Sequence, residues 1–202
     1  DYNFAGKVME FFVTHQTVEH FSGDCAVAFV FKDKTHQNKD LQQLLELNRF
    51  DATLGATLML SQVSGYKTKR LLIVGLGDTS LNEKNYMKVL QSLSSALSDA
   101  KVKNVVIADI QIDNRDESWI QLTTARVLRN ASYQVEKVDA KEDNEQGTLE
   151  AVSIYSENND AAEINKGLAI ANGMALTRRL GDLPSNICTP SYLAETAKSL
   201  AK

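Results

Sequence analysis

The sequence predicts an α/β protein: a three-layer sandwich in which helices cover both faces of a mixed, mostly parallel β-sheet. Short runs rich in apolar and β-branched residues alternate with longer segments of helical periodicity, which is the pattern of strand–helix–strand units. Several of the short runs are apolar without interruption, as expected for strands covered on both sides. With 43% hydrophobic and 24% charged residues among 202, the composition is that of a folded globular protein.

The first elements are two strands and a helix. Residues 7–14 (KVMEFFVT) and 25–32 (CAVAFVFK) read as strands, separated by a turn at 22–24. Cys25 opens the second run, so we interpret it as a buried strand residue rather than a reactive thiol. Residues 38–50 follow as a helix, which either of two side chains, Asn38 or Asp40, can cap. Its predicted face holds Leu41, Leu44, Leu45 and Asn48.

The middle of the chain predicts two strands followed by the clearest helix. Residues 56–63 and 69–74 (KRLLIV) read as strands, and the second ends at the turn Gly75-Leu76-Gly77-Asp78. Residues 82–100 then show helical periodicity, with an apolar face of Tyr86, Leu90, Leu93 and Leu97.

The next segment predicts a buried strand at 104–110, a helix and two more strands. Asp116 can cap the helix, whose predicted face holds Ile120, Thr124, Val127 and Ala131, with Trp119 at its border. Residues 133–138 and 150–155 read as strands that flank a charged, solvated loop at 139–148.

After Ser156 the character of the chain changes. A helix is expected from a cap at Asn159 or Asp160 to about Leu180, with Gly181 closing it and Pro184 preventing its continuation. Its predicted apolar stripe is Ile164, Leu168, Ala171 and Ala175. Thr189 and Pro190 are a cap and a first helical residue, and predict a last helix over 191–202.

The net charge, the cysteines and the chain ends limit the classes of protein to which this sequence can belong. The net charge of −4 argues against a dedicated binder of nucleic acid or anionic membranes, and no apolar run approaches the ~20 residues that span a bilayer. Two separate cysteines, Cys25 and Cys188, indicate a reducing, cytoplasmic setting. The chain lacks an initiator methionine and its last helix has no stop signal, so we expect a piece of a longer protein.

The most specific local candidate for chemistry is the turn Gly75-Leu76-Gly77-Asp78. A glycine turn between a strand and a helix can hold a phosphate on backbone N–H groups. The dinucleotide fingerprint needs a third glycine, however, and Ser80 stands in its place. The glycines are equally explained by the sharp exit of the chain from the sheet.

The other candidate groups have simpler structural interpretations. His15, His20 and His36 lack metal-ligand spacing, and no serine or cysteine has the surroundings of a catalytic nucleophile. A group of carboxylates follows strand 104–110: Asp109, Asp113, Asp116 and Glu117. We interpret Asp116 as a helix cap and the others as a solvated rim. The residues alone therefore predict no catalytic, cofactor-binding or metal-binding site.

Two basic groups could contact nucleic acid. Arg178 and Arg179 stand at the end of a predicted helix, where the helix dipole favours positive charge. Lys67, Lys69 and Arg70 precede a strand and fit a solvated sheet edge equally well.

Residues 171–200, ANGMALTRRLGDLPSNICTPSYLAETAKSL, closely resemble the junction between the N-terminal and catalytic domains of the M17 leucyl aminopeptidases. The specific part is Ala-Leu-Thr-Arg-Arg-Leu at 175–180, then Leu-Pro-Ser-Asn at 183–186 and Thr-Pro at 189–190. Residues 69–78 (KRLLIVGLGD) resemble the central strand of the family.

The resemblance implies a macro-domain-like α/β domain over residues 1–158, and a linker helix with the start of a catalytic domain over 159–202. It also implies a cytosolic hexamer that releases N-terminal amino acids from peptides with two divalent ions, Zn or Mn, in the catalytic domain. The family signature Asn-Thr-Asp-Ala-Glu-Gly-Arg-Leu does not occur here, so no catalytic or metal-binding residue is carried over.

The leading hypothesis is the non-catalytic N-terminal domain of a leucyl aminopeptidase, itself inactive and joined to its own catalytic domain. The alternatives are a macro-like module that binds a nucleotide or ADP-ribose near the 75–78 turn, and a DNA-binding module. Roles of some relatives suggest the last of these, and the net charge of −4 gives it little support.

Overall fold

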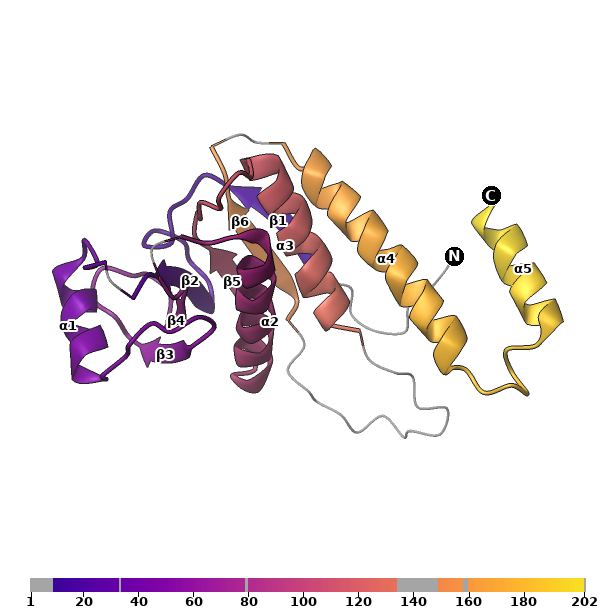
Figure 1. Ribbon diagram of the computed structural model, residues 1–202, viewed down its shortest axis with the longest axis horizontal. Helices are drawn as coiled ribbons and strands as arrows, with labels where there is room; N and C mark the ends of the chain where they lie inside the picture. The colour runs from indigo at the N-terminus through magenta and orange to yellow at the C-terminus, as the bar shows by residue number, and fades with distance from the viewer. Residues whose placement is uncertain (1–8, 33, 79, 134–148, 158–159, 202) are drawn as a thin grey trace.

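The computed structural model describes residues 9–32, 34–78, 80–133, 149–157 and 160–201, and Figure 1 shows their arrangement. The strands are β1 (Glu10–Thr14), β2 (Cys25–Val30), β3 (Thr57–Ser61), β4 (Arg70–Gly75), β5 (Asn104–Ile107) and β6 (Ala151–Tyr155). The helices are α1 (Lys39–Leu47), α2 (Glu83–Asp99), α3 (Glu117–Ala131), α4 (Ala162–Asp182) and α5 (Pro190–Leu200).

The strands form one sheet in the order β1-β6-β5-β2-β4-β3. Among the described strands every neighbouring pair is parallel except β3 with β4, and β3 lies at an edge of the sheet. In the centre, Val27 of β2 is in register with Leu72 of β4 and Ile107 of β5. The predicted mixed, mostly parallel sheet is confirmed.

Both faces of the sheet are covered, which explains the uninterrupted apolar strands. Along β2, Val27 belongs to a core cluster shared with α2 and α3, whereas Ala26 and Ala28 belong to a second cluster shared with α1. Since successive side chains of a strand point to opposite faces, the two clusters lie on the two sides of the sheet. The result is the expected order of helix, sheet and helix.

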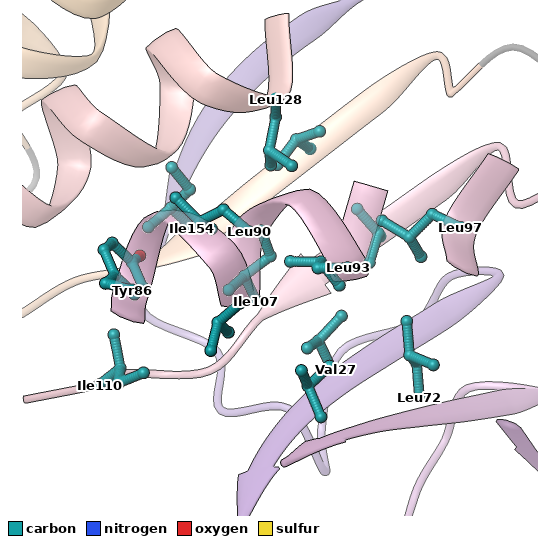
Figure 2. Packing of buried hydrophobic residues seen from close by; sticks show 14 of the residues in the cluster. Val27, Leu72, Tyr86, Leu90, Leu93, Leu97, Ile107, Ile110, Leu128 and Ile154 are labelled. Carbon is teal, nitrogen blue, oxygen red and sulfur yellow. The ribbon is translucent and has the colours of Figure 1, made fainter. Parts of the chain in front are cut away.

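Helix α2 carries the largest part of the first core. Its residues Tyr86, Val89, Leu90, Leu93 and Leu97 are buried, and Figure 2 shows this face directed toward Val27, Leu72 and Ile107 of the strands. Each fully buried leucine contributes about 1.5–3 kcal/mol relative to an exposed one. The periodicity that predicted this face was sufficient because α2 packs on the sheet along its whole length.

Four helices begin at a side-chain cap. The side-chain oxygens of Asn38, Asn82, Asp116 and Thr189 each accept backbone N–H groups at the first turns of α1, α2, α3 and α5. The predicted caps Asn38, Asp116 and Thr189 are confirmed, and Asn38 rather than Asp40 holds α1.

The predicted face of α3 is wrong in part. Its buried residues are Gln121, Thr123, Thr124, Ala125 and Leu128, while Ala131 is exposed and Ile120 and Val127 are half-buried. The difference arises because α4 packs along a second side of α3 (Figure 1). At the contact, a Cβ added to Gly167 would lie 2.3 Å from the Leu122 carbonyl oxygen. The sequence prediction assumed that α3 buries only one side, so the periodicity of its apolar residues could not indicate that α4 covers a second side.

Several boundaries also differ from the prediction. β5 ends at Ile107 rather than at 110, and Asn48 is an exposed C-cap of α1 rather than part of its buried face. Helix α4 has Ala161 at its N-cap, although the Asp160 carboxylate accepts the Ala162 N–H at 2.8 Å.

At the other end of α4, Gly181 lies inside the helix, and the chain becomes extended at Leu183 before Pro184. Proline sterics at the preceding residue therefore stop this helix, not a glycine C-cap.

Some predicted elements lie wholly or mainly outside the described residues: the strand at 133–138, the loop at 139–148 and the cap at Asn159. The proposed domain boundary at 158–159 lies there too and stays a prediction. In the part of the chain that the structure describes, no helix is both long and apolar enough to cross a membrane.

Candidate functional site

The turn at 75–78 has little capacity to bind phosphate, because three of its four backbone N–H groups already have acceptors within the protein. Three consecutive N–H groups donate to carbonyl oxygens of neighbouring segments: Gly75 to Ala56 (2.8 Å), Leu76 to Val30 (2.9 Å) and Gly77 to Ala52 (3.0 Å). A phosphate cradle needs such groups free and directed at the ligand. These hydrogen bonds instead connect the end of β4 to the end of β2 and to residues 52–56.

The two glycines of this turn have structural reasons of their own. A Cβ on Gly75 would lie 2.3 Å from the Thr53 carbonyl oxygen, so only glycine lets the backbone at 52–53 approach. Gly77 has φ of +77°, a conformation that other residues rarely adopt. The structural interpretation of the turn accounts for both positions.

The three histidines are separate, and two of them serve local structure. The Nδ1 atom of His20 lies 3.0 Å from the Thr17 hydroxyl, and that of His36 accepts the Asn38 N–H at 3.1 Å. Burial lowers the pKa of His36, although a backbone interaction with Asn38 and the charge of Glu19 oppose this shift. No group of three metal-ligating side chains comes together anywhere among the described residues.

The carboxylates after β5 are spread over different local tasks. Asp116 accepts the Trp119 N–H at 2.9 Å as the cap of α3, and Glu117 accepts from the Gln121 amide at 3.1 Å. Asp109 is exposed as a residue, but partial burial of its carboxyl raises its pKa, a backbone hydrogen bond from Ile110 lowers it, and the charges of Glu117 and Glu157 raise it further. Burial and the neighbouring carboxylates thus destabilise the charged form of Asp109.

One of the predicted basic residues, Arg70, forms an ion pair that no sequence pattern indicates. Its Nη2 lies 2.5 Å from Oδ2 of Asp24, and its Nε donates to Oδ1 of the same carboxylate at 3.2 Å. The Arg70 Nη1 donates to the Ala100 carbonyl at 2.5 Å, and Asp24 also accepts the Lys103 N–H at 3.0 Å. This network joins the amino ends of β2, β4 and β5 and leaves Arg70 occupied.

Arg178 is also engaged within the fold. It donates from Nη1 to the Asn130 carbonyl at 3.5 Å, and its guanidinium lies 5.7 Å from the centre of the Tyr133 ring. The Tyr133 hydroxyl donates to Asp182 at 2.8 Å. These contacts tie the end of α4 to the end of α3.

A second cluster that sequence reasoning missed joins the amino ends of α2 and α3. Arg115 donates from Nε to Glu83 at 2.7 Å and stacks 5.1 Å above the Trp119 ring. The Trp119 ring in turn lies 6.1 Å from that of Tyr86. Arg115 and Glu83 are 32 positions apart, so no local signal could have paired them.

Neither cysteine has the surroundings of a nucleophile. Cys25 is fully buried in β2, and burial raises its pKa to about 12. Cys188 is half-buried in the segment between α4 and α5, where its N–H donates to the Pro184 carbonyl at 2.9 Å. Both are free thiols.

The described residues thus form an α/β fold in which the polar groups named above make contacts within the fold, and its last two helices, α4 and α5, are joined by a proline-containing turn. Residues 26–142 match the model of the cytosol aminopeptidase family, N-terminal domain. The chain belongs to this family, as the resemblance of residues 171–200 led us to expect.

Curated relatives extend the match over nearly the whole chain. A probable cytosol aminopeptidase of Vesicomyosocius okutanii is 42% identical over 194 residues, which cover 96% of this chain and 40% of the relative. One from Paraburkholderia xenovorans is 35% identical over 196 residues, covering 89% of this chain and 39% of the relative. The chain therefore spans about two fifths of the length of these proteins.

Solved structures show the same fold at lower identity. A tomato leucine aminopeptidase mutant superposes with a TM-score of 0.67 at 23% identity, over 96% of this chain and 42% of that one. The bottromycin maturation enzyme BotP gives 0.70 at 16% identity, over 89% and 37%.

Proposed function

We propose that this chain is the non-catalytic N-terminal domain, with its linker helix, of a metal-dependent leucyl aminopeptidase. Two findings together support this proposal. The chain matches the family's N-terminal domain, and the match to the Vesicomyosocius okutanii relative covers 96% of this chain but only 40% of that relative. The longer protein would release N-terminal amino acids from peptides in the cytoplasm.

The described residues do not fit a divalent metal centre, since no three ligating side chains come together among them. We therefore assign the two ions proposed for the longer protein, zinc or manganese, to its remaining part. No catalytic step is assigned to a residue of this chain.

The role that remains for this chain is architectural. We propose that its partners are the catalytic domain of the same polypeptide and further copies of the longer protein in a hexamer, where the N-terminal domains help shape access of peptides to the active sites. DNA binding has less support, because Arg70 and Arg178 make contacts within the fold.

The division of labour is tested with leucyl-p-nitroanilide and manganese. We expect hydrolysis by the longer protein and none by the 202-residue chain at equal molar concentration. Turnover by the short chain, surviving repurification and absent from a mock preparation, would contradict the proposal. A longer protein that folds but fails to cleave any aminoacyl-p-nitroanilide would also contradict it.

A further inference from the structure

The buried residues of helix α4 lie in its first half, whereas its end is held to the end of α3 by contacts at the surface. Its buried residues are Ile164, Gly167 and Ala171, which face α3 and the core. Beyond Ala171, none of the described α4 residues is buried, although the helix continues to Asp182. Figure 1 shows this second half extending away from the sheet toward α5.

One side of α4, next to the side that faces α3, is uncharged over three turns. At 100° per residue, five residues fall within about 100° of the helix circumference. They are Ile170, Gly173, Met174, Thr177 and Gly181, all exposed, and we call them the outer α4 face. Ile170 and Met174 are 45% and 37% exposed, so the face presents apolar side chains to its surroundings.

Nothing in the described structure requires glycine at the two glycine positions of this face. Glycine inside a helix is less favourable than alanine. Neither Gly173 nor Gly181 has a positive φ, and a Cβ built on either meets no atom within 4 Å. Gly167, on the α3-facing side of the same helix, shows what such a glycine permits: close approach of a neighbouring backbone, that of α3.

Helix α5 adds to the same uncovered region. Leu193 and Leu200, two helical turns apart, are 45% and 62% exposed. Of the six large apolar side chains most exposed in the described part of the chain, four lie on α4 and α5. Clustering of exposed apolar side chains marks a surface that another body covers.

We propose that the outer α4 face packs closely against the peptidase unit of the same, longer polypeptide, with Gly173 at a backbone-to-backbone contact. This inference rests on the proposed function. The Vesicomyosocius okutanii relative contains about one and a half times as much chain again as the part matched here, and the match covers 96% of this chain. A large further body is therefore expected in the longer protein.

The size of the face favours an attached unit over a separate chain. Residues 170–181 cover about 16 Å of helix that is about 10 Å wide. The resulting area, on the order of 160 Å², is far below the ~800 Å² that each partner buries in a stable complex between separate proteins. A unit held by a short connection is present at millimolar effective concentration, so a small face suffices.

Hydrogen exchange tests the proposal in the 202-residue chain and in the longer protein. We expect the amides of residues 172–182 to exchange at least about tenfold more slowly in the longer protein, because packing there adds to the stability of this half of α4. Met174→Glu should remove that protection in the longer protein and leave the short chain unchanged. The matched control is Leu47→Glu, at a side chain 71% exposed on α1, which should change neither.

A substitution at Gly173 gives an independent sign test. Gly173→Ala should raise the Tm of the short chain by about 2–4 °C, because alanine is the better helix former. In the longer protein it should reduce the protection of α4, because the added Cβ occupies the contact.

Equal exchange in both proteins, or the same stabilising effect of Gly173→Ala in both, overturns the proposal while leaving peptidase activity and the proposed function intact. A dimer of the short chain that Met174→Glu dissociates overturns it in favour of a second copy. Conversely, protection of α4 in a longer protein that cleaves no peptide overturns the proposed function, and with it the identity of the unit that covers the face.

Discussion

Arg70 and Asp24 form a two-point ion pair that joins the amino ends of β4 and β2, with Nη2–Oδ2 and Nε–Oδ1 distances of 2.5 and 3.2 Å. Both side chains are 23% exposed, so the pair is mostly withdrawn from water. The same carboxylate holds the Lys103 N–H, and the same guanidinium holds the Ala100 carbonyl. Two side chains thus connect three strands and the end of α2.

Asp24→Ala should therefore destabilise the fold by about 2 kcal/mol, because it leaves a largely withdrawn guanidinium and a backbone N–H without their shared acceptor. The measurement is urea unfolding followed by circular dichroism at pH 7. The matched control is Glu195→Ala, which breaks an exposed pair with Lys198 (72% and 70% exposed) and should cost less than about 0.5 kcal/mol. Equal effects of the two substitutions would contradict the role assigned to Asp24.

The contribution of Asp24 should depend on pH in a defined direction. Burial alone would raise its pKa, but the hydrogen bonds from Arg70 and Lys103 and the charges of Arg70 and Lys69 lower it below its ordinary value. A lowered pKa in the folded state means that stability is fully present above about pH 4 and is lost as the pH falls through the folded pKa. The difference in unfolding free energy between wild type and Asp24→Asn should shrink from pH 7 to pH 3; a constant difference would refute the assignment.

Asp109 should behave in the opposite way. Burial, together with the charges of Glu117 and Glu157, raises its pKa, so its ionised form costs stability at neutral pH. Asp109→Asn should stabilise the chain at pH 7, since an amide oxygen can still accept the Ile110 N–H. The gain should vanish below about pH 4, where the wild-type carboxyl is protonated in both states. Thermal unfolding of both proteins at pH 7 and pH 3.5 measures it, and destabilisation at pH 7 would show that the charge is favourable where it lies.

These residues also show where sequence reasoning succeeds and where it stops. Strands β2 and β4 and helix α2 were predicted correctly because the neighbours that bury them leave a continuous or strictly periodic apolar pattern. The buried side of α3 was predicted only in part, because α4 joins it from a distance in sequence. The partner of Arg70 is 46 positions away, and neither residue carries a local signal of the pairing.

The candidate site was likewise predictable only as far as its signal is local in sequence. The 75–78 turn was visible in the sequence, but both interpretations of its glycines fitted. The structure favours the structural interpretation, because the carbonyl groups of Val30, Ala52 and Ala56 accept three of its N–H groups and because both glycines have steric or conformational reasons of their own. Membership of the family was readable from residues 171–200, because a junction motif is local in sequence whatever it packs against.

The last prediction separates those two interpretations of the turn. If its glycines serve packing, Gly75→Ala should destabilise the chain by more than about 2 kcal/mol, because the new Cβ would lie 2.3 Å from a backbone oxygen that has no easy retreat. Gly77→Ala should cost about 1 kcal/mol, the strain of alanine at φ of +77°.

Calorimetric titration of the wild-type chain with ADP-ribose up to millimolar concentration should give no binding heat, because three of the turn's amides already have acceptors. Gly181→Ala is the control for a glycine without local contacts and should not destabilise the chain. Saturable heat with ADP-ribose that Gly77→Ala abolishes in a folded variant would instead establish the turn as a nucleotide site, since a purely architectural glycine has no ligand to lose.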